Sequence, residues 1–225
     1  MRDKVTKPAS ALPFPTPILI ADKNPSVLEC LVPLLRSSIP GIALSFCSSH
    51  SYAMHCLTNA RYQVVVCGVQ LAEAQNFMLL RQHRAFQSFV PFIVIAEGRD
   101  RALAKSALEQ DGVEDIIVWP LNKNQLGDSV REAMSLYQLR VTIAHRKQTL
   151  QTLRSWQSFP PSENASGQHI SDHLLLPKPT LRVYQRTLQR LETNLSHLSD
   201  MVAECERQVR ARAIEHLDLL GREAT

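Results

Sequence analysis

The sequence has little glycine, few aromatic residues and no C-x-x-C pair. Seven glycines and an aromatic content of 6% in 225 residues argue against an all-β sandwich, which needs many turns. An odd, scattered set of cysteines fits a reducing compartment better than a disulfide framework. The five are Cys30, Cys47, Cys56, Cys67 and Cys205. We therefore expect a cytoplasmic protein without disulfides.

Long apolar runs and concentrated charge are also missing. No apolar run approaches the roughly 18 residues of a membrane span, so we expect no membrane partner. The formal net charge of +4 is shared equally by residues 1–123 and 124–225, whereas a nucleic-acid domain usually concentrates its positive charge. Residues 1–16 lack the apolar core of a signal peptide and are predicted to form a disordered tail.

From residue 17 onward, short apolar runs alternate with helical patterns. Asn24 as an N-cap and Pro25 at the first position predict the start of the first helix. The expected strands are 17–22, 42–47, 62–68, 91–97 and 115–120. Five such units predict an α/β domain over residues 17–138, with a doubly wound five-stranded parallel sheet that helices cover on both faces.

The remaining sequence is helical and differs in character. A long helix over 124–158 overruns the domain, a Pro/Ser-rich linker follows over 159–178, and a heptad pattern fills 179–221. Its seam carries Leu181, Leu188, Leu191, Leu195, Leu198, Val202 and Val209. Sustained heptads indicate a coiled coil or a helical hairpin, and the alternative is an amphipathic helix that packs on its own domain. Pairing within one chain or between chains stays open.

Three stretches resemble response-regulator receiver domains of two-component signalling. They are ILIADKNPSVLECL, YQVVVCGVQLAEAQNFMLLR, which corresponds to the third strand and the loop after it, and VPFIVIAEGRDRALAKSALEQDGVEDIIVWPL. The resemblance covers residues 17–135 without gaps and implies the flavodoxin-like receiver fold. In that family, a phosphoryl group moves from a phosphohistidine to an aspartate at the end of the third strand.

Position 68, which corresponds to that aspartate, is a glycine. Glycine has no carboxylate to phosphorylate, and Cys67 should point to the opposite side of the strand. The acidic pair that holds magnesium in the family corresponds to Asp22 and Lys23, and a single carboxylate beside a lysine suits Mg²⁺ poorly. We expect Asp22 to bond a nearby helix start or to pair with Lys23, in preference to binding a metal or ligand.

The remaining positions of the family site have changed as well. The hydroxyl residue corresponds to Ala96, and the lysine that pairs with the phosphoryl group corresponds to Trp119, before Pro120. Trp119 is expected to fill the emptied pocket rather than to stack on a base or partner, and its bond to Pro120 to be cis. Because only Asp22 of five positions survives, we predict a receiver-like domain without the phosphorylation switch. No enzyme activity, cofactor or metal is expected.

Three histidines invite other interpretations. His50 and His55 lie one turn apart, beside Cys56, but the set is incomplete for a four-ligand metal site. His197 lies on a predicted helix without the neighbours of a kinase histidine, so a solvated residue is favoured.

These observations predict a response-regulator-like signalling protein that acts by protein–protein interaction. The expected partners are a second copy, bound through the C-terminal helices, and a histidine kinase or other signalling protein. The family resemblance implies an output surface on the fourth helix, fifth strand and fifth helix, here including Leu103, Ala107 and Trp119.

The alternative is a transcriptional output module that binds nucleic acid through arginines of the C-terminal helices. These are Arg182, Arg186, Arg190, Arg207, Arg210 and Arg212. Acidic residues dilute this set, and no helix-turn-helix spacing is visible, so we regard nucleic acid as the less favoured partner. The acidic residues are Glu192, Asp200, Glu204 and Glu206.

Overall fold

A computed structural model describes residues 18–86, 89–110, 112–121, 123–157 and 178–222. The predicted tail over residues 1–16 and residues 159–177 of the predicted linker lie outside the described residues. The chain forms two compact units, of which one contains the chain up to Tyr137 together with everything from Glu206 onward. The other is Gln138–Cys205. The predicted heptad helix therefore contributes to both units.

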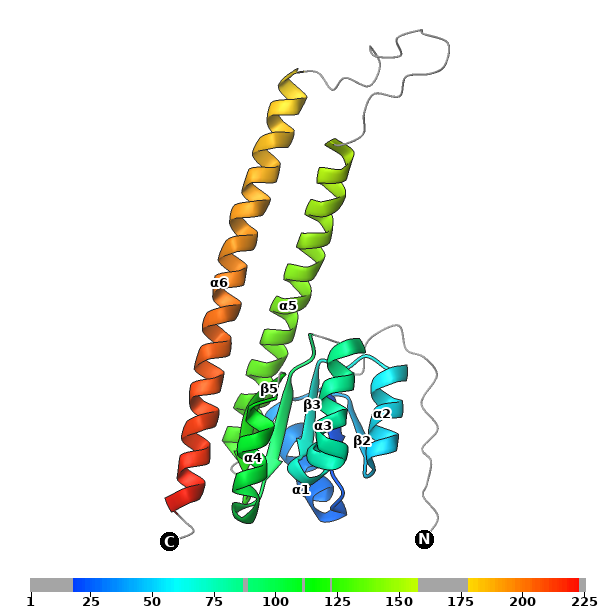
Figure 1. The fold of residues 1–225 in the computed structure, drawn as a ribbon, viewed down its shortest axis with the longest axis vertical. Helices are drawn as coiled ribbons and strands as arrows, with labels where there is room; N and C mark the ends of the chain where they lie inside the picture. The colour runs from blue at the N-terminus through cyan, green and yellow to red at the C-terminus, as the bar shows by residue number, and fades with distance from the viewer. Residues whose placement is uncertain (1–17, 87–88, 111, 122, 158–177, 223–225) are drawn as a thin grey trace. The chain divides into compact units, whose positions relative to one another are not determined.

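The first unit is built on a five-stranded parallel sheet with the order β2-β1-β3-β4-β5 (Figure 1). The strands are β1 (Ile18–Ala21), β2 (Leu44–Cys47), β3 (Val64–Gly68), β4 (Phe92–Ala96) and β5 (Val113–Val118). This order is that of the flavodoxin-like doubly wound fold, so the predicted fold class is confirmed. The order reverses between β1 and β3, where ligands of such sheets bind beyond the strand ends.

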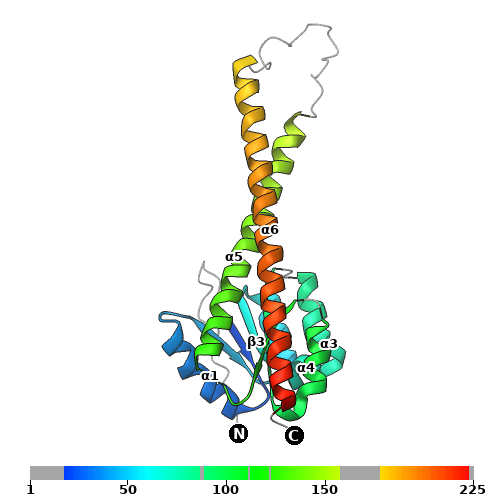
Figure 2. The same ribbon diagram turned by 90° about the vertical axis from the view of Figure 1, so that its left-hand side faces the viewer.

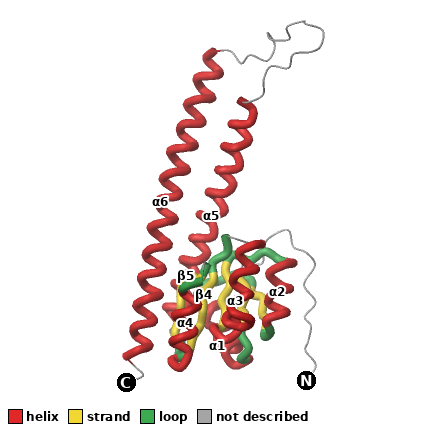
Figure 3. Tube along the Cα trace, in the orientation of Figure 1, coloured by secondary structure: helices red, strands yellow, loops and turns green. Residues whose placement is uncertain are grey.

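Helices cover both faces of this sheet (Figure 3). They are α1 (Pro25–Ser38), α2 (His50–Asn59), α3 (Val69–Phe86), α4 (Arg101–Leu108), α5 (Lys123–Gln157) and α6 (Lys178–Arg222), with a 3-10 turn η1 at Gly98–Asp100. One apolar core lies between the sheet and α1 with α5, and the other between the sheet and α2, α3 and α4. Fully buried strand residues such as Val65 and Val66 alternate between the two cores, as expected for a sheet covered on both faces.

The first helix begins as the sequence predicts. Pro25 occupies its first position, and the Asn24 side chain accepts a hydrogen bond from the Ser26 N–H at 3.0 Å. In the same way, the Ser49 hydroxyl accepts from the Tyr52 N–H at 3.3 Å at the start of α2. These caps fix the points at which the chain leaves β1 and β2.

One local prediction is wrong. The loop expected after the third strand is absent, because α3 begins at Val69, directly after Gly68. No proline stands between Val69 and Phe86, so nothing in this stretch stops a helix from starting. After β4, the 3-10 turn η1 leads directly into the short helix α4.

In the second unit, α5 and α6 form a helical pair. Ile143, Leu150 and Leu188 are buried, and Arg154 donates to Glu192 at 2.5 Å across the pair. Much of the predicted seam is only half-buried, namely Leu191, Leu195, Leu198 and Val202. The Leu181 side chain lies outside the described side chains. The two helices thus pair within one chain and leave part of the seam accessible.

Within the described parts of the chain, no helix combines the length and the apolarity needed to cross a membrane.

Candidate functional site at the strand ends

A small cleft of about 80 Å³ lies at the carboxyl ends of the strands. Its walls include Asp22, Lys23, Gly68, Glu97, Arg99 and Trp119, which together are called the strand-end cleft. The structure thus brings together four of the residues selected from the sequence. Pockets for cofactor-sized molecules usually measure about 300–1,000 Å³, so this cleft suits only a small group.

Gly68 lies against the side chain of Asp22. Their strands are neighbours in the sheet, with Ala21 opposite Cys67. A Cβ atom added at Gly68 would overlap Asp22 Oδ2 and lie 2.8 Å from its Cγ. The Asp22 carboxylate therefore occupies the space in which a side chain at position 68 would begin.

Asp22 bonds the start of the following helix, as one of the sequence-based alternatives predicted. Its Oδ1 accepts from the Asn24 N–H at 2.7 Å. Burial raises the pKa of the Asp22 carboxyl, the bond from Asn24 lowers it, and the nearby Glu97 carboxylate raises it again, so that the net shift is upward. A raised pKa favours the neutral carboxyl, which is a weaker ligand for a cation.

Three charged residues of this region were missed from the sequence. Glu97, directly after β4, pairs with Arg99 at 2.8 Å. Asp100 is 8% exposed, and its carboxylate accepts from the Glu97 N–H at 3.4 Å. The available signal was that the carboxyl ends of parallel strands share one edge of the sheet.

These residues do not fit the magnesium ion that the receiver resemblance implies. Mg²⁺ requires oxygen ligands in near-octahedral geometry, including one or two carboxylates. Here Asp22 already bonds Asn24, Glu97 pairs with Arg99, and Gly68 offers no side chain. Across the described residues, no group of three or more His, Cys, Asp or Glu side chains is placed to hold a metal ion.

The other substituted positions lie around the cleft in different ways. Trp119 lines the cleft, packs against the α1/α5 core and remains partly exposed. The Trp119–Pro120 peptide bond is cis, as predicted, and Pro120 is exposed. Ala96 is 1% exposed and belongs to the opposite core, as does Cys67, whose thiol thus lies away from the cleft.

The predicted output surface is not a single exposed patch. Ala107 is fully buried, and Leu103 packs against the α2/α3/α4 core, whereas Trp119 packs against the core on the other face. The three residues lie on neighbouring elements, but their side chains pack on opposite faces of the sheet.

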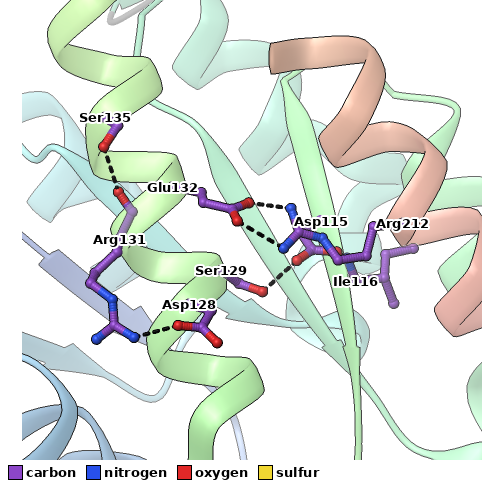
Figure 4. A network of polar contacts seen from close by, with 8 residues as sticks. All are labelled: Asp115, Ile116, Asp128, Ser129, Arg131, Glu132, Ser135 and Arg212. Atoms are coloured by element: carbon purple, nitrogen blue, oxygen red, sulfur yellow. Dashed lines mark hydrogen bonds and ion pairs between the residues drawn. The ribbon is translucent and has the colours of Figure 1, made fainter. Parts of the chain in front are cut away.

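A polar network lies beside β5, the last strand at one edge of the sheet (Figure 4). Asp115 is 2% exposed and accepts from the Ser129 hydroxyl at 2.5 Å and from the Ile116 N–H at 2.8 Å. Arg212 of α6 donates twice to the Glu132 carboxylate of α5, once at 3.0 Å. Residues 80 positions apart give no local sequence signal, and the sequence analysis missed this pair.

The three histidines show no such organisation. The His55 ring stacks on Tyr52 with centroids 6.1 Å apart, and its Nδ1 lies 3.1 Å from the Asn59 side-chain nitrogen. His197 is exposed on α6, as expected for a solvated helix residue.

No protein-family model matches the sequence, and comparison with curated proteins finds no significant relative. Solved structures do match. An adenylate cyclase structure from Rhodopirellula baltica has a TM-score of 0.52 at 15% identity, over 60% of this chain and 98% of that chain. An uncharacterized protein from Neptuniibacter caesariensis has a TM-score of 0.50 at 18% identity, over 55% and 90%.

A response regulator receiver domain protein from Clostridium thermocellum also matches, with a TM-score of 0.48 at 19% identity, over 55% of this chain and 98% of that chain. At these identities, similarity shows the fold alone. The first two structures share the fold of the five-stranded sheet and the helices that cover it. The chain is thus a flavodoxin-like domain of receiver topology, continued by two long helices.

Proposed function

We propose that the protein is a response-regulator-like signalling protein that acts by protein–protein contact without aspartyl phosphorylation. One observation carries the proposal: at the end of β3 stands Gly68, and the Asp22 carboxylate fills the space beside it. A phosphoacceptor must offer a carboxylate at this strand end, and a glycine cannot.

The surroundings of Gly68 support the same proposal. A transferred phosphoryl group needs positive or hydrogen-bonding groups that stabilise its charge. At the corresponding positions, Ala96 has no hydroxyl, and Trp119 has no ammonium group. The cleft is lined by three acidic residues, Asp22, Glu97 and Asp100, against two basic ones, Lys23 and Arg99, of which Arg99 pairs with Glu97, so it offers no excess of positive charge to an anion.

Treatment of the full chain with acetyl phosphate and Mg²⁺, followed by intact-mass spectrometry, tests the absence of phosphorylation. We expect no phosphorylated species from the wild type. The Gly68→Asp variant should also stay unmodified, because the other site residues are missing and Asp22 crowds the new side chain. A phosphorylated carboxylate in the wild-type domain would refute the proposal. Phosphorylation of the variant alone would show that the glycine at position 68 is by itself the reason why the wild type is not phosphorylated.

The helical pair is proposed to serve self-association or docking. Leu191, Leu195 and Leu198 are half-buried in the single chain, so a second copy would remove more apolar surface from water. Size-exclusion chromatography with light scattering should show a dimer of the full chain. Leu195→Lys should shift it to the monomer, and Ser196→Lys, exposed on the same helix, should not. A monomeric wild type would refute self-association.

Nucleic-acid binding remains the second candidate, with less support. Arg210 donates to the Leu108 carbonyl and Arg212 to Glu132, so these two guanidinium groups already have partners within the chain. Binding to duplex DNA that falls steeply with salt would favour this candidate, and no binding at low salt would remove it.

A further inference from the structure

We propose that the β5 edge of the domain is a binding site for an arginine-bearing helix, and that the chain occupies it with its own segment Glu206–Arg222. This segment is called the docking segment, and the β5-edge site comprises Leu108, Asp115, Asp128 and Glu132. The inference goes beyond the proposed function, because it depends neither on phosphorylation nor on the helical pair of the second unit.

The docking segment fits the site by shape. Ala213 is fully buried and belongs to the α2/α3/α4 core, in which Ala104 and Ala107 of α4 also lie. Small side chains on both helices allow close approach. Arg210 donates to the Leu108 carbonyl at 3.2 Å. Leu108 ends α4, where carbonyl groups lack partners within the helix, so the segment also satisfies a helix end.

The site also fits by charge. Arg212 forms two bonds with Glu132, a planar arrangement that arginine makes and lysine does not (Figure 4). Its pKa is raised chiefly by the bond with Glu132, against a smaller lowering by burial, with further contributions from Asp115 and Asp128. Glu132 thus binds the guanidinium directly, while Asp115 and Asp128, which have Ser129 and Arg131 as their own partners, add only attraction at longer range. The site therefore fits a helix that carries an arginine beside a small residue.

The docking segment runs past β5, between α4 and α5 (Figure 2). Strand β5 is at the edge of the sheet, and an uncovered edge offers unpaired backbone groups to other chains. Among the described side chains, the segment buries only Val209 and Ala213, and of these only Ala213 belongs to the α2/α3/α4 core, so departure of the segment removes little of that core. The vacated site would accept the same segment of a second copy.

Charge reversal in the full chain tests this site. Arg212→Glu places a carboxylate against Glu132 and should release the segment. Hydrogen-exchange mass spectrometry should then show roughly tenfold or faster exchange in residues 206–222 and at the edge strand β5. Arg190→Glu makes the same charge change at an exposed position of α6 and should leave both regions unchanged. The double variant Arg212→Glu/Glu132→Arg should restore protection.

A labelled peptide of residues 206–222 probes the vacated site directly. It should bind the Arg212→Glu chain, and should bind the wild type at least about tenfold more weakly, because the attached segment competes at high effective concentration. A peptide that carries the same Arg212→Glu change should not bind. If the variant folds poorly, Glu132→Gln in the full chain should still accelerate exchange in residues 206–222. Unchanged exchange in these variants, or equal peptide binding to both chains, would overturn the proposal.

Discussion

The strand-end cleft and the β5-edge site are two polar regions of one domain, and they are built in opposite ways. In the cleft, Gly68 offers no side chain, and the Asp22 carboxylate fills the space beside it. At the β5 edge, Asp115 is buried with its hydrogen bonds made, and Glu132 receives a guanidinium at two oxygens. In the structure, the polar side chains of the β5 edge hold a helix, whereas the strand-end cleft has no side chain at position 68, which is the basis of the proposed loss of phosphorylation.

The strongest test of the β5 edge is a charge in the core at Ala213. Ala213→Asp buries a carboxylate at a fully buried position of α6 and should reduce hydrogen-exchange protection of residues 206–222 roughly a hundredfold. Ala211→Asp is the matched control, because Ala211 is exposed on the same turn of the helix. Equal effects of the two variants would show that Ala213 is not buried in solution.

A double-mutant cycle tests the crowding between Gly68 and Asp22. Gly68→Ala should lower the free energy of unfolding by about 2 kcal/mol, because the added Cβ overlaps the Asp22 carboxylate. In an Asp22→Ala background, the same change should cost little, so a clear coupling energy is expected from urea unfolding of the four proteins. Additive effects would contradict the packing described for the cleft.

The bond from Ser129 to Asp115 should have a measurable effect on stability. Ser129→Ala leaves the buried Asp115 carboxylate without one donor and should lower the free energy of unfolding by about 1.5 kcal/mol. Ser135→Ala, which removes an exposed hydroxyl bonded to the Arg131 carbonyl on the same helix, should change it by less than about 0.5 kcal/mol. A reversed ranking would contradict the network in Figure 4.

The smallest expected effect concerns the pH dependence of stability at Asp22. Its folded-state pKa lies above the unfolded value, so the free energy of unfolding falls as pH rises through that window. Asp22→Asn keeps an acceptor for the Asn24 N–H and removes this fall. Unfolding curves across pH should therefore show that the free energy of unfolding of the variant increases relative to that of the wild type as pH rises. A relative decrease would contradict the raised pKa of Asp22.

The sequence was sufficient to predict the doubly wound parallel sheet, because buried parallel strands are continuous apolar runs. The receiver resemblance gave four residues of the cleft, Asp22, Lys23, Gly68 and Trp119, and missed Glu97, Arg99 and Asp100. The sequence did not reveal where the last part of α6 packs. Val209 continues the heptad pattern, and such a pattern is the same whether the apolar stripe faces a second helix or its own domain. Ala213 and Arg212, which make the contact, are a small and a charged residue that periodicity does not single out.

One measurement on the full-length protein addresses both regions together: hydrogen-exchange mass spectrometry with and without acetyl phosphate and Mg²⁺. We expect identical exchange at the ends of β1, β3 and β4 in both conditions, with residues 206–222 protected throughout. A change at the end of β3, or release of residues 206–222 on addition of acetyl phosphate, would contradict this expectation, because either result requires a phosphoryl-sensitive site in the domain.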